Sequence, residues 1–158
     1  MSVRITLKEG DLASEVADAI VSAAISDAIA LGEAAVTGAG GSAARFVIHA
    51  AAKPPGGAAS EASVRSAMRS ALARARELGV KTLAVPALGA GSAGFSVQRC
   101  AEVLIEEARA HAASETSLEE IRFVLSGEPA YRMFEMVNDA ARVAEQMTKL
   151  RQRARPAN

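Results

Sequence analysis

A chain of 158 residues, half of them hydrophobic and 23% charged, suits one globular domain with a buried core and excludes wholesale disorder. The 18 basic and 18 acidic residues cancel, so no attraction of the whole surface to nucleic acid or anionic lipid is expected. One cysteine excludes a disulfide framework and a clustered-cysteine metal site, and an aromatic content of 3% leaves few side chains to stack on bases.

The first third of the chain predicts strands. Apolar and polar residues alternate over residues 3–8, as in a half-exposed strand, and no apolar signal core or membrane-spanning run is present. Residues 18–24 form a largely apolar run, which is typical of a central strand covered on both faces. Residues 33–37 and 45–50 flank the turn-rich segment 38–42, so an antiparallel pair is predicted there.

The remaining two thirds predict helices that alternate with strands. Ser60 and Ser96 are suited to cap helix N-termini, and Gly79 can end the first of these helices in the left-handed conformation. Buried strands are predicted over residues 82–85 and 121–125. This alternation implies parallel pairing with right-handed crossovers, and therefore an α/β fold with a mixed, mostly parallel sheet.

Pro129 suits the first turn of a final helix. The inward face predicted for this helix contains Met133, Val137, Ala140, Ala144 and Met147. Basic residues accumulate after it, so we divide the chain into a single domain over residues 1–148 and a flexible basic tail over residues 149–158. A tail that binds nucleic acid is the alternative interpretation of the last ten residues.

The strongest local signal is a glycine-rich loop at residues 89–94, directly between a strand and a helix. Glycine permits positive φ angles and close approach of a ligand, and the amides of a helix N-terminus favour phosphate. The spacing fits the dinucleotide fingerprint, but the loop follows a late strand and the next strand ends without an acid for a ribose. A nicotinamide-dependent dehydrogenase is therefore not predicted, and a purely structural tight turn is the alternative.

Five segments in this order resemble the macro domain family, the ADP-ribose-binding module. They are GDL at 10–12, DAIVSAA at 18–24, GEAAVTGAG at 32–40, VIHAA at 47–51 and PALGAGSAGF at 86–95. The resemblance extends from Val3 to about Val137. It implies a three-layer α/β/α fold with a mixed six-stranded sheet and a ligand cleft at the ends of the strands.

The resemblance also implies a set of ligand-binding residues. It gives Asp11 a hydrogen bond from the adenine amino group with the Leu12 amide nearby, holds a diphosphate on loop amides, and packs Phe95 on the distal ribose. The loop residues concerned are Gly89, Ala90, Gly91, Ser92, Ala93 and Gly94. Judged on residue type alone, Asp11 is also suited to stabilising a turn, and Phe95 to filling the core.

The chain departs from the family pattern at three positions. Asparagines are common in the family where this chain has Ser22 and Ile25, and a stacking aromatic is common near Ser126. The family's glycine-rich loop and helix after residues 18–24 are absent, because residues 25–31 run straight into the next predicted strand. Isoleucine forms no side-chain hydrogen bond, so we assign no catalytic residue.

The absent helix should uncover apolar strand surface. We expect either a homodimer that closes the gap or a domain of marginal stability. The preferred function is binding of ADP-ribose or a related phosphorylated nucleotide, with weak or absent hydrolysis. Hydrolysis of ADP-ribosyl or O-acetyl-ADP-ribose esters and a non-catalytic interaction domain with a decayed cleft are the alternatives. An ADP-ribosylated protein is a candidate partner, a membrane or nucleic acid is not, and the cytoplasm is the expected compartment.

The remaining reactive side chains have structural interpretations. Cys100 is interpreted as a buried thiol, with a thiolate at a helix N-terminus as the alternative, and His49 as a hydrogen-bonded strand histidine. His111 is expected to complement a helix dipole. The acidic pairs at 106–107 and 119–120 are interpreted as solvated faces. No metal site or cofactor is predicted.

Overall fold

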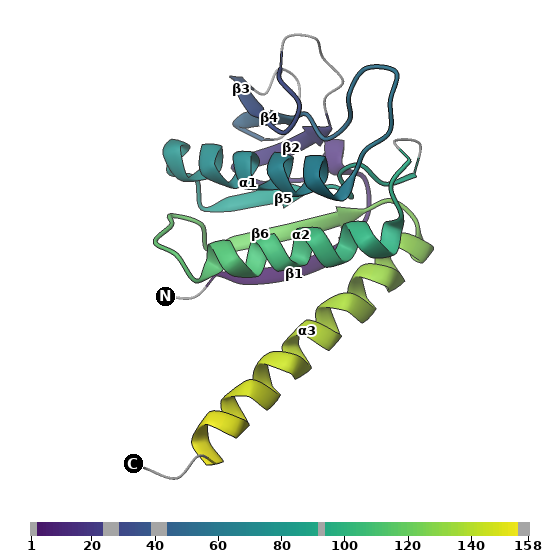
Figure 1. Ribbon diagram of the computed structural model, residues 1–158. Coiled ribbons are helices and arrows are strands. Elements are labelled where there is room, and N and C mark those ends of the chain that lie inside the picture. The colour runs from purple at the N-terminus through teal and green to yellow at the C-terminus, as the bar shows by residue number, and fades with distance from the viewer. Residues whose placement is uncertain (1–2, 24–28, 39–43, 92–93, 155–158) are drawn as a thin grey trace.

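The computed structural model describes residues 3–23, 29–38, 44–91 and 94–154 (Figure 1). Its strands are β1 (Arg4–Glu9), β2 (Ala19–Ala23), β3 (Ala34–Gly38), β4 (Phe46–Ala50), β5 (Thr82–Val85) and β6 (Glu120–Leu125). Its helices are the 3-10 helix η1 (Leu12–Ser14) and the α-helices α1 (Glu61–Leu78), α2 (Val97–Ala112) and α3 (Glu128–Ala154).

The described strands form one mixed sheet in the order β1-β6-β5-β2-β4-β3. In this order the first five strands run parallel to one another. The edge strand β3 runs antiparallel to β4, with Val36 opposite Ile48. The predicted α/β class, the mostly parallel sheet and the antiparallel pair at its edge are confirmed. The carboxyl ends of β1, β6 and β5 consequently meet at one end of the sheet.

The helix ends are set by local sequence, as predicted. The Ser60 hydroxyl accepts a hydrogen bond from the Ser63 amide at 3.1 Å, and the Ser63 hydroxyl accepts one from the Ser60 amide at 2.9 Å. Gly79 ends α1 with a φ of 69°. Ser96 caps α2 by accepting a hydrogen bond from the Arg99 amide.

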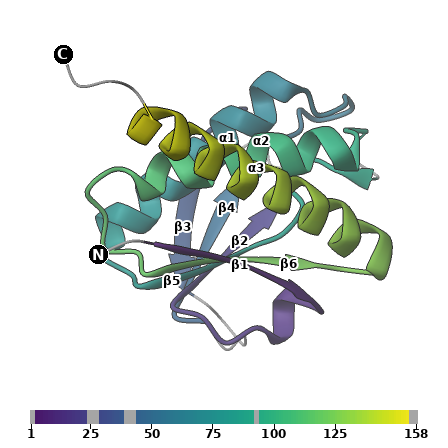
Figure 2. The same cartoon turned by 90° about the horizontal axis from the view of Figure 1, so that it is seen from below.

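The helices α1, α2 and α3 lie side by side on one face of the sheet (Figure 2). The core between these two layers contains the fully buried Leu83, Phe123 and Phe134. On the opposite face lie η1 and its neighbouring loop, above a small cluster of Ala17, Ile20, Ala44, Ala84 and Val124 (Figure 2). Ile25 lies outside the described residues, and residues 29–33 lead into β3 without a helix.

A charged cluster attaches the η1 segment to that second face. Arg122 of β6 lies 2.7 Å from Glu15 and 2.9 Å from Glu120, and both carboxylates are buried. The hydrogen bond from Arg122 lowers the pKa of Glu120. Lys8 also lies 3.1 Å from Glu15, and Thr6 donates a hydrogen bond to Glu120 at 2.6 Å. The cluster thus supplies contacts on the face where the resemblance implies a second helical layer.

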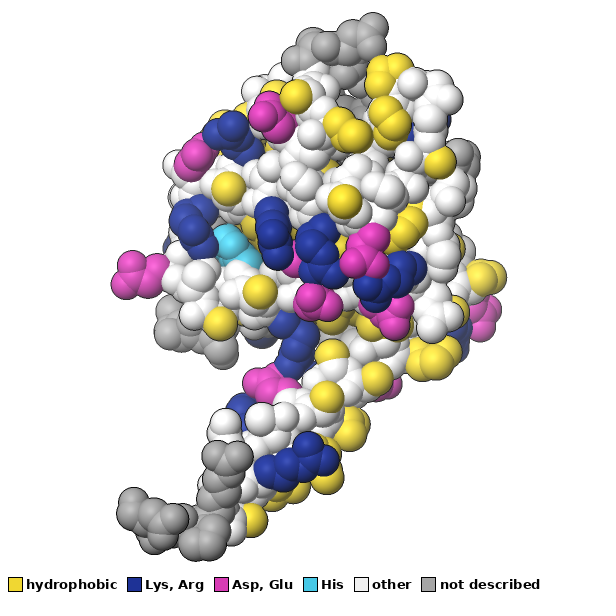
Figure 3. Space-filling model, viewed as in Figure 1, with side chains coloured by type: hydrophobic (Ala, Val, Ile, Leu, Met, Phe, Trp, Pro, Cys, Tyr) yellow, Lys and Arg dark blue, Asp and Glu magenta, His cyan; other side chains and the backbone are white. Residues whose placement is uncertain are grey.

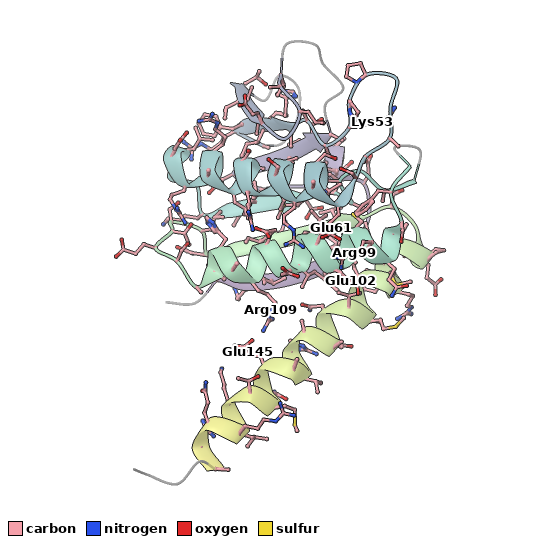
Figure 4. All side chains as sticks on the ribbon, in the orientation of Figure 1. Lys53, Glu61, Arg99, Glu102, Arg109 and Glu145 are labelled. Atoms are coloured by element: carbon pink, nitrogen blue, oxygen red, sulfur yellow. The ribbon has the colours of Figure 1, made fainter. Side chains whose placement is uncertain are left out.

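A second charged cluster joins α1 to α2. Arg65 and Arg69 each approach the buried Glu107 to 2.6 Å. Burial favours a higher pKa for Glu107, but the hydrogen bonds from Arg69 and Arg65 outweigh it and lower the pKa. Acidic and basic side chains gather along this boundary (Figure 3), where Arg99 of α2 also meets Glu61 of α1 (Figure 4).

These clusters correct the interpretation of the acidic pairs. Glu106 and Glu119 are exposed, as predicted, but Glu107 and Glu120 are buried. Glu107 lies on the side of α2 that faces α1, and strand alternation directs Glu120 toward Arg122. The arginine partners of Glu107 come from the distant helix α1, and Arg122, the partner of Glu120, comes from the same strand β6.

The helix α3 begins as predicted, with Pro129 in its first turn. Phe134 is fully buried, and Ala130, Val137 and Ala141 pack against the same core. Of the predicted inward face, Ala140, Ala144 and Met147 are instead exposed, because α3 extends past the sheet (Figure 1). Its outer half is held to α2 by an ion pair between Arg109 and Glu145 (Figure 4). Residues 149–154 form the last turns of α3, so the predicted boundary at residue 148 falls inside a helix.

Candidate functional site

A cavity of about 450 Å³ opens at the carboxyl ends of β1, β5 and β6. This size is within the range of small-molecule sites. The cavity is lined by Gly10, Asp11, Leu12, Pro86, Ala87, Ala90, Gly91, Val97, Val124, Ser126 and Ala130. Backbone and small apolar side chains therefore form most of its surface.

The first wall is the turn after β1. The Gly10 amide donates to the Leu125 carbonyl at 2.9 Å, which fixes this turn to the end of β6. Asp11 caps η1, and its Oδ1 accepts a hydrogen bond from the Ala13 amide at 3.1 Å. Among the described residues, no donor engages Asp11 Oδ2. The turn-stabilising role and a ligand-binding role are thus compatible, one on each carboxylate oxygen.

The second wall is the loop after β5. The Leu88 amide donates to the Pro86 carbonyl at 2.9 Å, and the Ala90 amide donates to the Ala87 carbonyl at 3.2 Å. Leu88 is fully buried, and the Cys100 thiol donates to its carbonyl at 3.1 Å. Burial raises the pKa of Cys100 to about 12, so the buried-thiol interpretation holds and the activated thiolate is wrong.

Gly89, Gly91 and Gly94 of this loop all have positive φ, and the first two differ in their surroundings. At Gly89, where φ is 80°, a Cβ would lie 2.6 Å from Val64 Cγ2, so the backbone is packed against α1. At Gly91, where φ is 71°, a Cβ would meet no described atom within 4 Å. Gly91 is exposed and lines the cavity, whereas Gly89 does not. Gly89 therefore allows the loop to pack against α1, and the Gly91 backbone lies at the surface of the cavity.

Internal hydrogen bonds use several of the amides that the resemblance assigned to a diphosphate. The Gly94 amide donates to the Gly91 carbonyl at 2.9 Å, and the Ala90 amide donates to the Ala87 carbonyl at 3.2 Å. The Gly91 amide donates to no described residue. Ser92 and Ala93 lie outside the described residues. Of the loop amides that the structure describes, Gly91 is thus the one best placed to bind an anion.

The remaining predicted residues fall in two places. Leu12 and Ala90 line the cavity together with Asp11 and Gly91, but Phe95 is half-buried against the core and is not among the lining residues. A Cβ on Gly94 would lie 3.0 Å from the Ala58 side chain, so this glycine, like Gly89, serves loop packing.

The third wall was largely missed by sequence reasoning. Val124 and Ser126 stand at the end of β6, and Val97 and Ala130 lie in the first turns of α2 and α3. Ser126 was noted in the sequence because the family commonly has a stacking aromatic near this position. Ser126 does line the cavity, and its side chain has no ring that could stack there. Val124, Val97 and Ala130 are common apolar residues. Only their positions, next to a predicted strand end or helix start, indicated in the sequence that they could line a site.

Acid–base groups are scarce at the cavity. Among its described lining residues, Asp11 is the ionisable side chain, with no lysine, arginine or histidine. His49 instead pairs with Thr37 at 2.8 Å, and His111 pairs with Thr116 at 2.8 Å. His111 lies in the last turn of α2, as predicted, but burial and the nearby Arg76 lower its pKa and so disfavour the charged imidazolium there.

The described residues contain neither a metal-binding group nor a membrane-spanning helix. No group of histidine, cysteine, aspartate and glutamate in that part of the chain is arranged to hold a metal ion. None of the helices described there has the length and apolar character needed to cross a membrane.

Comparisons with known sequences bear on this geometry. The family model for the Macro domain matches residues 6–104. An uncharacterized protein of Mycobacterium tuberculosis is 39% identical over 106 residues, which is 67% of this chain and 29% of that protein. A macro domain-containing protein of Caldanaerobacter subterraneus is 35% identical over 105 residues, 65% of this chain and 59% of that protein. The chain thus matches less than a third of the mycobacterial relative's length.

Solved structures agree with the fold. The Trypanosoma brucei macrodomain in complex with ADP-ribose has a TM-score of 0.77 at 20% identity, over 84% of this chain and 68% of that one. The Oceanobacillus iheyensis macrodomain with MES bound has a TM-score of 0.74 at 16% identity, over 89% and 92% of the two chains. The mixed sheet, the cavity at its strand ends and the family match lead to one conclusion: this chain belongs to the macro domain family.

Proposed function

We propose that this macro domain binds ADP-ribose or a related phosphorylated nucleotide in the 450 Å³ cavity. The observation that carries the proposal is the convergence of Asp11, Leu12, Ala90 and Gly91 on one cavity. These four belong to the residues that the family resemblance assigns to the ligand. The T. brucei relative in complex with ADP-ribose supports the choice of ligand. An ADP-ribosylated protein is the proposed partner.

The diphosphate would be held by backbone rather than by basic side chains. The described lining residues include no lysine or arginine, so the Gly91 amide and the first turn of α2, where Val97 lines the cavity, would supply the positive potential. Asp11 Oδ2 would accept a hydrogen bond from the adenine amino group. Ser126 offers no stacking face, so we expect weaker binding than in a site with an aromatic at this position.

Titration calorimetry with ADP-ribose tests the proposal through Gly91. Gly91→Glu should abolish binding, because the new carboxylate would stand in open space beside the phosphates. Gly91→Ala is the matched control, since it has the same positive-φ strain without the charge, and it should still bind. No heat with millimolar ADP-ribose and folded wild-type protein would reject the proposal. If Gly91→Glu binds ADP-ribose with the same affinity as the wild type, the assignment of the diphosphate to this loop is rejected.

Weak or absent hydrolysis is the second part of the proposal. It is supported by the scarcity of acid–base groups, because Asp11 already accepts the Ala13 amide and Cys100 is buried with a raised pKa. We expect no release of ADP-ribose from a mono-ADP-ribosylated protein above the rate in buffer alone. Turnover at catalytic enzyme concentration, abolished by Gly91→Glu, would instead favour the hydrolase alternative.

A further inference from the structure

An exposed apolar surface that does not line the cavity lies on α3. Among the described residues, the large hydrophobic side chains that are exposed are Val16, Leu31, Met136, Val143, Met147 and Leu150. Four of these six belong to α3, with exposures from 45% to 62%. Hydrophobic side chains are visible along the part of α3 that extends past the sheet (Figure 3). Such a continuous apolar surface marks an interaction site.

The exposed apolar residues follow a heptad pattern. The spacings alternate between four and three residues through Met136, Ala140, Val143, Met147, Leu150 and Ala154. This is the a/d spacing of a coiled coil, and we call these six residues the α3 seam. All six are exposed. The seam is separate from the face of α3 that packs on the domain, which contains Phe134, Val137 and Ala141.

The projecting part of α3, residues 142–154, has little support from its own domain beyond the Arg109–Glu145 ion pair. Every residue from 142 to 154 is exposed, although the segment is helical throughout. An isolated helix of this length is marginal in water, so contacts from a partner would stabilise it. The Arg109–Glu145 ion pair fixes the direction in which the helix leaves the domain (Figure 4).

The charges of α3 indicate which partner fits the seam. Residues 135–145 contain three acids and one base, whereas residues 146–154 contain three bases and no acid. Two copies side by side in parallel would bring their basic ends together. Two antiparallel copies would place the acidic half of one against the basic half of the other.

We propose that the α3 seam is a homodimer interface in which two copies of this chain form an antiparallel coiled coil. The six seam positions then pair about residue 145, with Val143 against Met147 of the second copy and Ala140 against its Leu150. Asp139 and Arg153 flank the seam at equivalent g positions, so each Asp139 meets an Arg153 across the interface. Arg153 makes no ion pair with a described residue of its own chain.

Sedimentation equilibrium of the full chain between micromolar and millimolar concentration tests the proposal. The wild type should dimerise, and Met147→Glu should raise the dissociation constant about 100-fold, because a carboxylate would be buried in a central layer. Gln152→Glu is the matched control, since it adds the same charge to the same exposed part of α3 away from the seam and should change the dissociation constant less than about threefold. Circular dichroism of each variant confirms that α3 remains helical.

A charge exchange tests the antiparallel direction. Asp139→Arg and Arg153→Asp should each weaken dimerisation, and the double variant should recover most of the wild-type affinity. A monomeric wild type at millimolar concentration overturns the proposal. A dimer that is insensitive to Met147→Glu places the interface elsewhere, and a dimer that Met147→Glu breaks without recovery in the charge exchange rejects the antiparallel arrangement.

Discussion

Replacing Arg122 with methionine is expected to lower the free energy of unfolding by about 3 kcal/mol. The guanidinium lies 2.7 Å from Glu15 and 2.9 Å from Glu120, whose side chains are only 4% and 10% exposed. Methionine retains the packing of the stem but leaves two buried carboxylates without their shared cation. Lys8 and Thr6 still contact these carboxylates, so the expected loss is at the lower end for a broken buried pair. Urea unfolding followed by circular dichroism measures it.

Arg4→Met is the matched control. Arg4 also pairs with Glu120, but at 3.7 Å and with 70% of its side chain exposed, so its removal should cost less than about 0.5 kcal/mol. Equal losses for the two variants would contradict the role given to Arg122.

The pH dependence supplies a second readout. The folded-state pKa of Glu120 lies below its ordinary value, chiefly because of Arg122. Its stabilising contribution is therefore present above the unfolded pKa, about 4.3, and is lost as the pH falls through the folded value. The difference in stability between wild type and Arg122→Met should shrink as the pH falls from 7 to 3. A constant difference would indicate that lost packing, rather than lost charge pairing, explains the effect.

The Arg122 cluster also shows where sequence reasoning reached its limit. Strands and helix ends were predictable because their signals are local, such as Ser60 with its partner three residues later and Gly79 at a helix end. Glu15 and Arg122 are 107 residues apart, and their pairing depends on how β6 lies beside η1. Adjacent acids such as Glu119 and Glu120 look alike in sequence until strand alternation determines which one is buried.

The helix α3 shows a related limit. Two apolar stripes run along it, and the sequence alone does not reveal which one meets the sheet. We predicted Ala140, Ala144 and Met147 on the inner side, but Phe134 and Ala141 lie there. The choice depends on where the helix leaves the domain, which is a tertiary property.

The parts of the candidate site that could be predicted are those where the sequence signals a turn or a glycine loop. Asp11 and Gly91 follow strands at positions where a turn or a glycine loop is evident in the sequence, and both line the cavity. Val97, Val124 and Ala130 also line it but have no distinctive chemistry, so only their arrangement in space identifies them. Gly89 and Gly94 were predicted as ligand contacts, and the structure shows that the absence of a side chain at both also permits close packing.

This division of the glycines predicts unequal effects of the same substitution. Gly91→Ala should cost about 1 kcal/mol, because its Cβ meets open space and the positive φ is the main strain. Gly89→Ala should cost about 3 kcal/mol, because overpacking against Val64 and Ala59 adds to a similar φ strain. Urea unfolding of both variants measures the difference.

Shortening Val64 identifies the cause of that difference. In a Val64→Ala background the Gly89→Ala cost should fall by about 1 kcal/mol or more, since the Cγ2 that lies 2.6 Å from the new Cβ is gone. The Gly91→Ala cost should be unchanged in the same background. Equal costs at both glycines, or no coupling between Gly89 and Val64, would mean that loop strain alone governs stability. In that case the positive φ angles of the glycines, rather than the contact between this loop and α1, would determine the shape of the cavity wall.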